Sequence, residues 1–251
     1  MIRETIVFGP INSRRLGSSL GINALPEKGK LCNFDCIYCE CGWNKDGRGD
    51  THIPTASDLR DALESRLSEC ASQGVAIDSI TFSGDGESTL NPDFPKMIDA
   101  TIALRDKYYP DARISVLTNA TRITVPDVKA ALRKIDSPIL KIDAPTVAGA
   151  ELINRPQGKY ELDRIIEAME SMDGDFVLQT MMLRSPQFDS SSEEVLAGWM
   201  DIVRRIRPRE IMVYTINRPT PQTGLEKFTV EQMRQMVSPL INEGFNIKIY
   251  G

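Results

Sequence analysis

Short β-rich segments alternate with longer helical patterns along most of this chain, and the alternation limits its fold more than any other feature. The expected strands cover residues 20–24, 79–83, 112–117, 139–143, 176–181 and 210–215. The expected helices lie near residues 56–73, 94–108, 126–134, 159–172, 192–206 and 229–243. Strands that alternate with helices over short connections form a parallel sheet with helical cover. About six strand–helix units fit, fewer than the eight of a closed barrel, so we predict an α/β fold with an open, partial barrel; a flat doubly wound sheet is the alternative.

The composition excludes several classes of protein. The chain has 251 residues, of which 41% are hydrophobic and 26% charged, as is ordinary for a globular protein with a core. We predict a single domain over residues 1–251. No run approaches the roughly 18 apolar residues that span a bilayer, and the N-terminus lacks the pattern of a signal peptide. We therefore expect a cytoplasmic protein with no membrane partner.

Charge and histidine content narrow the possible partners further. Acidic residues outnumber basic ones by 35 to 30, which leaves a net charge of −5. Proteins that bind the backbone of nucleic acids usually carry a basic excess, and this chain has none. His52 is the single histidine, so sites built from several histidines are excluded.

Four of the five cysteines lie within ten positions, and Cys70 stands apart. An odd number of cysteines in a cytosolic chain argues against a disulfide framework and for a metal. Cys32, Cys36 and Cys39 have the spacing C-x3-C-x2-C, and three thiolates from one loop can hold three irons of a [4Fe–4S] cluster. The fourth iron is then open to a small molecule. Structural zinc is the alternative, but Cys41 follows Cys39 too closely for a usual knuckle.

With an aromatic residue, Tyr38, before the last cysteine, this motif resembles that of the radical S-adenosylmethionine (SAM) superfamily. The resemblance implies a partial (βα)6 TIM-like barrel with a cluster loop at about residues 31–44. It also implies two cofactors, the [4Fe–4S] cluster and SAM, and an external electron donor of the flavodoxin or ferredoxin type. Proteins of this family are oxidoreductases that cleave SAM reductively to a 5′-deoxyadenosyl radical, which abstracts a hydrogen atom from the substrate.

Further residues match places where the family binds SAM. Gly84, Asp85, Gly86 and Glu87 follow the second expected strand and resemble the family's "GGE" segment, with Asp85 in place of the usual first glycine. Glycines there permit a close approach of the backbone to a ligand. Asn119 ends the next strand and, like Tyr38, is an expected SAM contact; capping of a loop is the alternative for Asn119.

Polar residues on later strands are candidates for catalysis and substrate binding. Lys141 and Asp143 are two positions apart on one strand, so they share a face, and we predict catalytic roles for both. A structural ion pair is the alternative. The expected substrate contacts are Arg14, Arg15, Gln179 and Arg218. The arginine pair suits a carboxylate or phosphate group, although it could also be a solvated turn.

One subgroup of the family resembles this chain over nearly its whole length, the wyosine-tRNA synthase-like radical SAM proteins. The segments that carry this resemblance are residues 8–10, 13–21, 36–39, 82–87, 154–156 and 214–219. Wyosine synthases have additional cysteines before this motif, whereas no cysteine precedes Cys32, and a basic excess for tRNA is lacking. We therefore predict a radical SAM enzyme with a small-molecule or peptide substrate. A tRNA-modifying enzyme is the disfavoured alternative, and an iron–sulfur protein for electron transfer or sensing is another.

Overall fold

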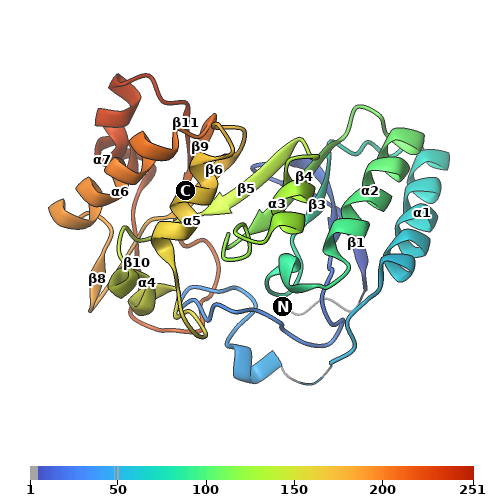
Figure 1. Cartoon of the computed structure of the whole chain (residues 1–251), viewed down its shortest axis with the longest axis horizontal. Coiled ribbons are helices and arrows are strands. Elements are labelled where there is room, and N and C mark those ends of the chain that lie inside the picture. The colour runs from blue at the N-terminus through green and yellow to red at the C-terminus, as the bar shows by residue number, and fades with distance from the viewer. Residues whose placement is uncertain (1–4, 48, 50) are drawn as a thin grey trace. The chain divides into compact units, whose positions relative to one another are not determined.

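The computed structural model describes residues 5–47, 49 and 51–251 (Figure 1). Residues 1–4, which belong to the N-terminus that was expected to lack a signal peptide, and residues 48 and 50 lie outside this description. The chain forms two compact units. The first unit comprises residues up to 32, 44–118 and 125–138, and the second comprises 33–43, 119–124 and 139–251. That one domain spans residues 1–251 stays a prediction.

The strands of the first unit lie in the order β1 (Val7–Ser13), β2 (Gly17–Ile22), β3 (Ser79–Phe82) and β4 (Arg113–Thr118). β1 and β2 form an antiparallel hairpin, whereas β2, β3 and β4 are parallel, as the strand–helix alternation predicts. All four residues of β3 are buried. A central strand of a parallel sheet is covered on both faces, which explains why the polar residues Ser79 and Thr81 are buried as well as the apolar ones.

Three α-helices of the first unit match the sequence pattern closely, whereas its two short 3-10 helices were not predicted. The helices are η1 (Asn44–Gly47), α1 (Ala56–Ser72), η2 (Ser88–Leu90), α2 (Phe94–Tyr108) and α3 (Pro126–Leu132), of which η1 and η2 are the 3-10 helices. α1 begins at a capping box, in which the Thr55 side chain accepts from the Asp58 amide and Asp58 accepts from the Thr55 amide. Its buried stripe ends at Cys70, so this cysteine is a core residue. α1 and α2 lie side by side (Figure 1).

In the second unit the parallel strands lie in the order β5 (Ser137–Lys141), β6 (Val177–Met181), β9 (Glu210–Tyr214) and β11 (Ile247–Tyr250). The first two residues of β5 still belong to the first unit. A small antiparallel sheet has the order β10 (Glu226–Lys227), β7 (Leu183–Ser185) and β8 (Phe188–Asp189). Sequence patterning did not predict this small sheet or β11, because segments of two to four residues are too short to show a period.

The second unit has four α-helices, α4 (Val147–Ile153), α5 (Leu162–Glu170), α6 (Glu193–Ile206) and α7 (Val230–Asn242). α5 packs against α6, and α7 packs against β11 (Figure 1). The buried face of α6 includes Trp199, whose indole donates to the Thr180 hydroxyl at 3.0 Å. The sequence patterning did not predict α4. Among the helices of the described residues, none is long and apolar enough to cross a membrane.

Candidate functional site

The segment after β3 holds the chain at the point where it enters the cysteine loop. The Leu31 amide donates to the Asp85 carbonyl at 3.1 Å, and the Glu87 amide donates to the Leu31 carbonyl at 2.9 Å. Leu31 and Gly86 thereby form a parallel bridge. Since Leu31 directly precedes Cys32, the predicted SAM-binding segment fixes the backbone next to the first predicted cluster ligand.

Two glycines make this close approach possible. Gly86 has a φ of +139°, and a Cβ built on it would lie 1.9 Å from the Leu31 carbonyl oxygen. A Cβ on Gly84 would lie 2.0 Å from Oδ1 of Asn23, the atom that accepts from the Asp85 amide at 3.1 Å. The sequence predicted a close approach of this backbone to a ligand. In the structure, neighbouring atoms of the protein itself leave no room for a Cβ at either glycine, whether or not a ligand is bound.

The Glu87 carboxylate is turned into the first unit. Its Oε1 accepts hydrogen bonds from the Thr89 amide at 3.1 Å, from the Thr89 hydroxyl at 2.5 Å and from the Thr118 hydroxyl at 2.6 Å. Glu87 is buried, as are Thr89 and Thr118. The carboxylate therefore ties the Gly84–Glu87 segment to the end of β4.

Asn119 follows β4 and, in the second unit, binds the cysteine loop. Its Nδ2 donates to Oδ1 of Asn33 at 2.7 Å, and its Oδ1 accepts from the Thr121 amide at 3.0 Å and the Thr121 hydroxyl at 2.7 Å. Asn33 in turn donates to the Thr121 hydroxyl at 2.7 Å. This is the loop-capping arrangement that the sequence left open, and it orders the residue that follows Cys32. The SAM contact of Asn119 stays a prediction.

Lys141, Asp143 and Tyr38 come together in a buried polar network of the second unit. The Tyr38 hydroxyl donates to Oδ2 of Asp143, and Nζ of Lys141 lies 3.6 Å from the same oxygen. Asn154 donates to this oxygen at 2.7 Å, and the Met181 amide donates to the other at 2.9 Å. The ion pair that the sequence left open for Lys141 and Asp143 is thus present. Asn154, which the sequence analysis had not assigned to a site, belongs to the same network.

Lys141 is held on several sides. Its Nζ donates to the hydroxyls of Tyr38 at 3.1 Å and Tyr214 at 2.7 Å, and it lies 5.1 Å and 5.3 Å from the centres of these two rings. Burial is the largest single influence on the pKa of Lys141 and lowers it, but Asp143, Tyr214 and Cys36 together raise it by more, so the pKa lies above its usual value. Lys141 is therefore an ammonium ion at neutral pH.

Cys36 connects the network to the cysteine motif. Its sulfur accepts a hydrogen bond from Nδ2 of Asn154 at 3.4 Å. Burial raises the pKa of the Cys36 thiol to about 11, although the charge of Lys141 and the hydrogen bond from Asn154 both act to lower it. The Cys39 amide donates to the Cys36 carbonyl at 3.1 Å, which makes a tight turn between these two cysteines.

The three cysteine thiols are of the chemical kind that binds an iron–sulfur cluster. Cys32 closes a segment of the first unit, while Cys36 and Cys39 belong to the second, and all three are partly exposed. Clusters are held by thiolates whose sulfurs accept N–H hydrogen bonds, and the sulfur of Cys36 accepts one here. Within residues 5–47, 49 and 51–251, no three or more His, Cys, Asp or Glu side chains lie close enough together to hold a metal ion.

The predicted substrate residues have separate surroundings. Arg14 and Arg15 lie in the turn between β1 and β2 of the first unit. Arg218 is exposed in the second unit and pairs with Glu40 at 2.8 Å. Gln179 is buried in β6. Their roles in substrate binding stay predictions.

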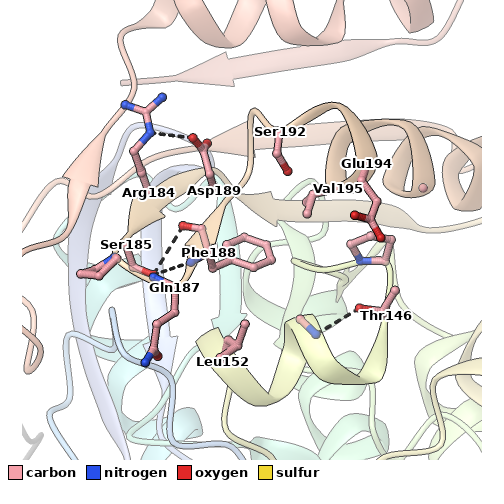
Figure 2. Close-up of a pocket in the computed structure, with 14 residues that line it drawn as sticks. Thr146, Leu152, Arg184, Ser185, Gln187, Phe188, Asp189, Ser192, Glu194 and Val195 are labelled. Atoms are coloured by element: carbon pink, nitrogen blue, oxygen red, sulfur yellow. Dashed lines mark hydrogen bonds and ion pairs between the residues drawn. The ribbon is translucent and has the colours of Figure 1, made fainter.

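The second unit also contains a pocket of about 600 Å³ (Figure 2). It lies between α4, the β7–β8 hairpin and the start of α6. Arg184 and Asp189 pair at 2.7 Å on its wall, and Phe188 and Leu152 supply apolar surface. The described lining includes none of the predicted site residues, so this pocket is distinct from the polar network.

Comparison with known families decides the class of the chain. The Radical SAM superfamily profile matches residues 27–196, which include the cysteine motif and the Gly84–Glu87 segment. The chain belongs to the radical SAM superfamily. It is 31% identical over 246 residues to a UPF0026 protein of Methanocaldococcus jannaschii, with 95% of this chain and 72% of the relative covered. A UPF0026 protein of Synechocystis is also 31% identical, with 88% and 78% covered.

Solved structures confirm the predicted fold class, a partial TIM-like barrel of the radical SAM type. Streptococcus suis SuiB bound to SAM has a TM-score of 0.64 and 18% identity, with 89% of this chain and 49% of SuiB covered. A radical SAM methyltransferase of Sphaerobacter thermophilus has a TM-score of 0.69 and 15% identity, with 92% and 66% covered. TYW1 with a bound lysine–pyruvate adduct has a TM-score of 0.64 and 12% identity, with 92% and 76% covered. The chain thus spans about half the length of SuiB, and at these identities the likeness concerns the fold.

Replacing Gly86 by alanine should destabilise the protein, because the new Cβ would meet the Leu31 carbonyl. Gly244→Ala is the matched control, since Gly244 has a φ of +91° with no atom within 4 Å of the added Cβ. We expect the control to cost about 1–2 kcal/mol through backbone strain alone, and Gly86→Ala to cost at least about 1 kcal/mol more. Urea unfolding followed by circular dichroism measures both, and equal losses would contradict the assigned contact.

Replacing Asp143 by alanine should leave the buried ammonium of Lys141 without its counter-charge and lower the free energy of unfolding by about 3–5 kcal/mol. Adding Lys141→Met removes that charge. We therefore expect the double variant to be more stable than the sum of the two single losses predicts, by at least about 1 kcal/mol. A double-mutant cycle in urea gives this coupling directly, and strictly additive losses would show that the pair does not interact.

Proposed function

We propose that this chain is a radical SAM enzyme in which Cys32, Cys36 and Cys39 hold one [4Fe–4S] cluster. The observation that carries the proposal is that the three-cysteine motif lies inside the segment matched by the superfamily profile. When bound, the cluster supplies one electron that breaks a carbon–sulfur bond of SAM, and the resulting 5′-deoxyadenosyl radical takes a hydrogen atom from the substrate.

The residues around the motif suit distinct tasks in this chemistry. We assign SAM binding to the backbone of Gly84, Asp85, Gly86 and Glu87, together with Asn119 and Tyr38. The engagement of the Glu87 carboxylate by two threonines supports a backbone role for that segment. Because Tyr38 is buried and held by Asp143, it would form a rigid wall of the SAM site.

Lys141 and Asp143 are proposed to act as an ion pair that keeps a permanent positive charge, the Lys141 ammonium, beside the reacting centre. The ammonium of Lys141 has three partners within its network, and its pKa is raised. A lysine that forms a covalent adduct with a carbonyl compound, such as pyruvate, must first be a neutral amine. The surroundings of Lys141 therefore favour a fixed cation over a nucleophile and do not support a TYW1-like use of this residue.

The substrate is proposed to be a small molecule or a peptide with anionic groups, held in part by Arg14, Arg15, Gln179 and Arg218. The net charge of −5 supports this choice over tRNA. A flavodoxin or ferredoxin is the proposed electron donor, and the cytoplasm the proposed location, since such chemistry requires a reducing environment.

Anaerobic reconstitution tests the cofactor assignment. The protein should bind about four irons and four sulfides per chain, and Cys32→Ala, Cys36→Ala or Cys39→Ala should each abolish the cluster. Cys41→Ala and Cys70→Ala are the matched controls and should retain it. With SAM and dithionite, the loaded protein should release 5′-deoxyadenosine, measured by chromatography. A loaded cluster that never cleaves SAM would indicate an electron-transfer or sensing protein, and bound zinc would refute the cluster.

A gel-shift assay at near-physiological salt tests the preference against tRNA. We expect weak binding that falls steeply with salt and is the same for the wild type, Arg14→Ala and Arg15→Ala, because no basic excess is present. Submicromolar binding that either substitution weakens at least tenfold would favour the tRNA-modifying alternative instead.

A further inference from the structure

Asn154, Arg155 and Pro156 form a sharp end to α4, and the proposed function has given this segment no role so far. The Asn154 amide donates to the Ala150 carbonyl at 2.7 Å, as the last bond of the helix. Arg155 then takes the left-handed conformation, with a φ of +47°. This conformation costs a residue other than glycine about 1–2 kcal/mol, and it persists only where the surroundings enforce it.

The Arg155 amide donates to the Ala150 carbonyl at 2.9 Å, which closes the end of α4 in this conformation, and the cysteine loop adds further contacts. The Asp35 amide donates to the Asn154 carbonyl at 2.9 Å, and the Gln157 amide donates to the Asn33 carbonyl at 2.7 Å. The guanidinium of Arg155 lies 4.9 Å from the centre of the Trp43 ring. On the other side of Asn154, the Ile37 amide donates to the Ile153 carbonyl at 3.0 Å, so the end of α4 is bound to the loop along its main chain on both sides of Asn154.

These contacts place the Asn154 side chain against Cys36. Asn154 is 2% exposed, and its Nδ2 lies 3.4 Å from the sulfur of Cys36, 3.0 Å from the Tyr38 hydroxyl and 2.7 Å from Asp143. The carboxylate fixes the orientation of the amide, because only the nitrogen can donate to it. The nitrogen has two hydrogens for these three acceptors. Because the Tyr38 hydroxyl is bonded to the same Asp143 oxygen, one N–H group can serve both oxygens, which leaves the other for the sulfur.

We propose that Asn154 is a positioning residue that donates a hydrogen bond to the Cys36 sulfur in the cluster-bound protein and raises the reduction potential of the cluster. This inference rests on the proposed function. Reduction adds negative charge that is shared by the ligand sulfurs, so a donor at a sulfur stabilises the reduced state more than the oxidised state. Burial strengthens the effect, because little water competes for the sulfur.

A purely structural role for Asn154 predicts a different result. If its amide served only to cap α4 and to satisfy Asp143, its removal would change stability and leave the potential of a loaded cluster unchanged. The midpoint potential therefore separates the two roles. Gln222 supplies a matched control, because its Oε1 accepts from Arg155 at 2.9 Å, so its removal perturbs the same segment and leaves the hydrogen bond to the Cys36 sulfur in place.

The experiment compares the wild type with Asn154→Ala, Asn154→Gln and Gln222→Ala after anaerobic reconstitution, by redox titration monitored with electron paramagnetic resonance. We expect Asn154→Ala to make reduction about tenfold less favourable, a shift of about 59 mV to lower potential for one electron. Asn154→Gln keeps the donor and should recover part of the shift, and Gln222→Ala should match the wild type. A loaded Asn154→Ala cluster with the wild-type potential would overturn the inference and leave the proposed function intact.

Two further outcomes concern protein that does not hold a cluster, either the wild type or the Asn154→Ala variant. A wild-type protein that binds no [4Fe–4S] cluster would overturn the proposed function and this inference together. If Asn154→Ala fails to hold its cluster, the wild type labelled with ¹⁵N in its asparagine side chains is examined by pulsed electron paramagnetic resonance of the reduced state. A ¹⁵N coupling to the cluster that is lost in Asn154→Gln supports the hydrogen bond, and its absence from the wild type overturns it.

Discussion

A buried carboxylate must be surrounded by hydrogen-bond donors. In the second unit this carboxylate is Asp143, and the donors gathered around it organise the rest of the candidate site. Its two oxygens receive a phenol, a side-chain amide, a main-chain amide and a nearby ammonium ion. These donors come from the cysteine loop, the end of α4, β6 and β5. This single residue, two positions after the end of β5, therefore fixes four separate parts of the unit with respect to one another, at the cost of burying a charge that these donors compensate.

The same arrangement orders the cysteine loop largely through Tyr38 and the main chain. Tyr38 is anchored by Asp143 and Lys141, and the main chain on the Cys36 side is bonded to the end of α4. In the first unit, Leu31 is bonded to the Gly84–Glu87 segment. A loop that is ordered on both flanks requires less conformational entropy to be lost when a cofactor binds, which is the advantage of preorganisation.

The sequence was sufficient for the fold class and for most long elements, because α1, α2, α6 and α7 carry clear caps or apolar stripes. It was also sufficient to pair Lys141 with Asp143, since alternate residues of a strand share a face. It did not predict α4, and Asn154 entered only as part of a resemblance. A seven-residue helix has too few turns for a periodic signal, and the role of Asn154 depends on contacts with residues more than 100 positions away, which no local pattern encodes.

The stacking of Arg155 on Trp43 has an optical consequence. The chain has two tryptophans, and they lie in different surroundings: Trp43 is partly exposed on the cysteine loop, and Trp199 is enclosed in the core on the buried face of α6. From these surroundings we expect emission from Trp43 to respond to what binds at the nearby cysteines and emission from Trp199 to report mainly on the integrity of the core. The protein thus carries one fluorophore for occupancy of the loop and another for folding, and replacing Trp199 by phenylalanine would isolate the first.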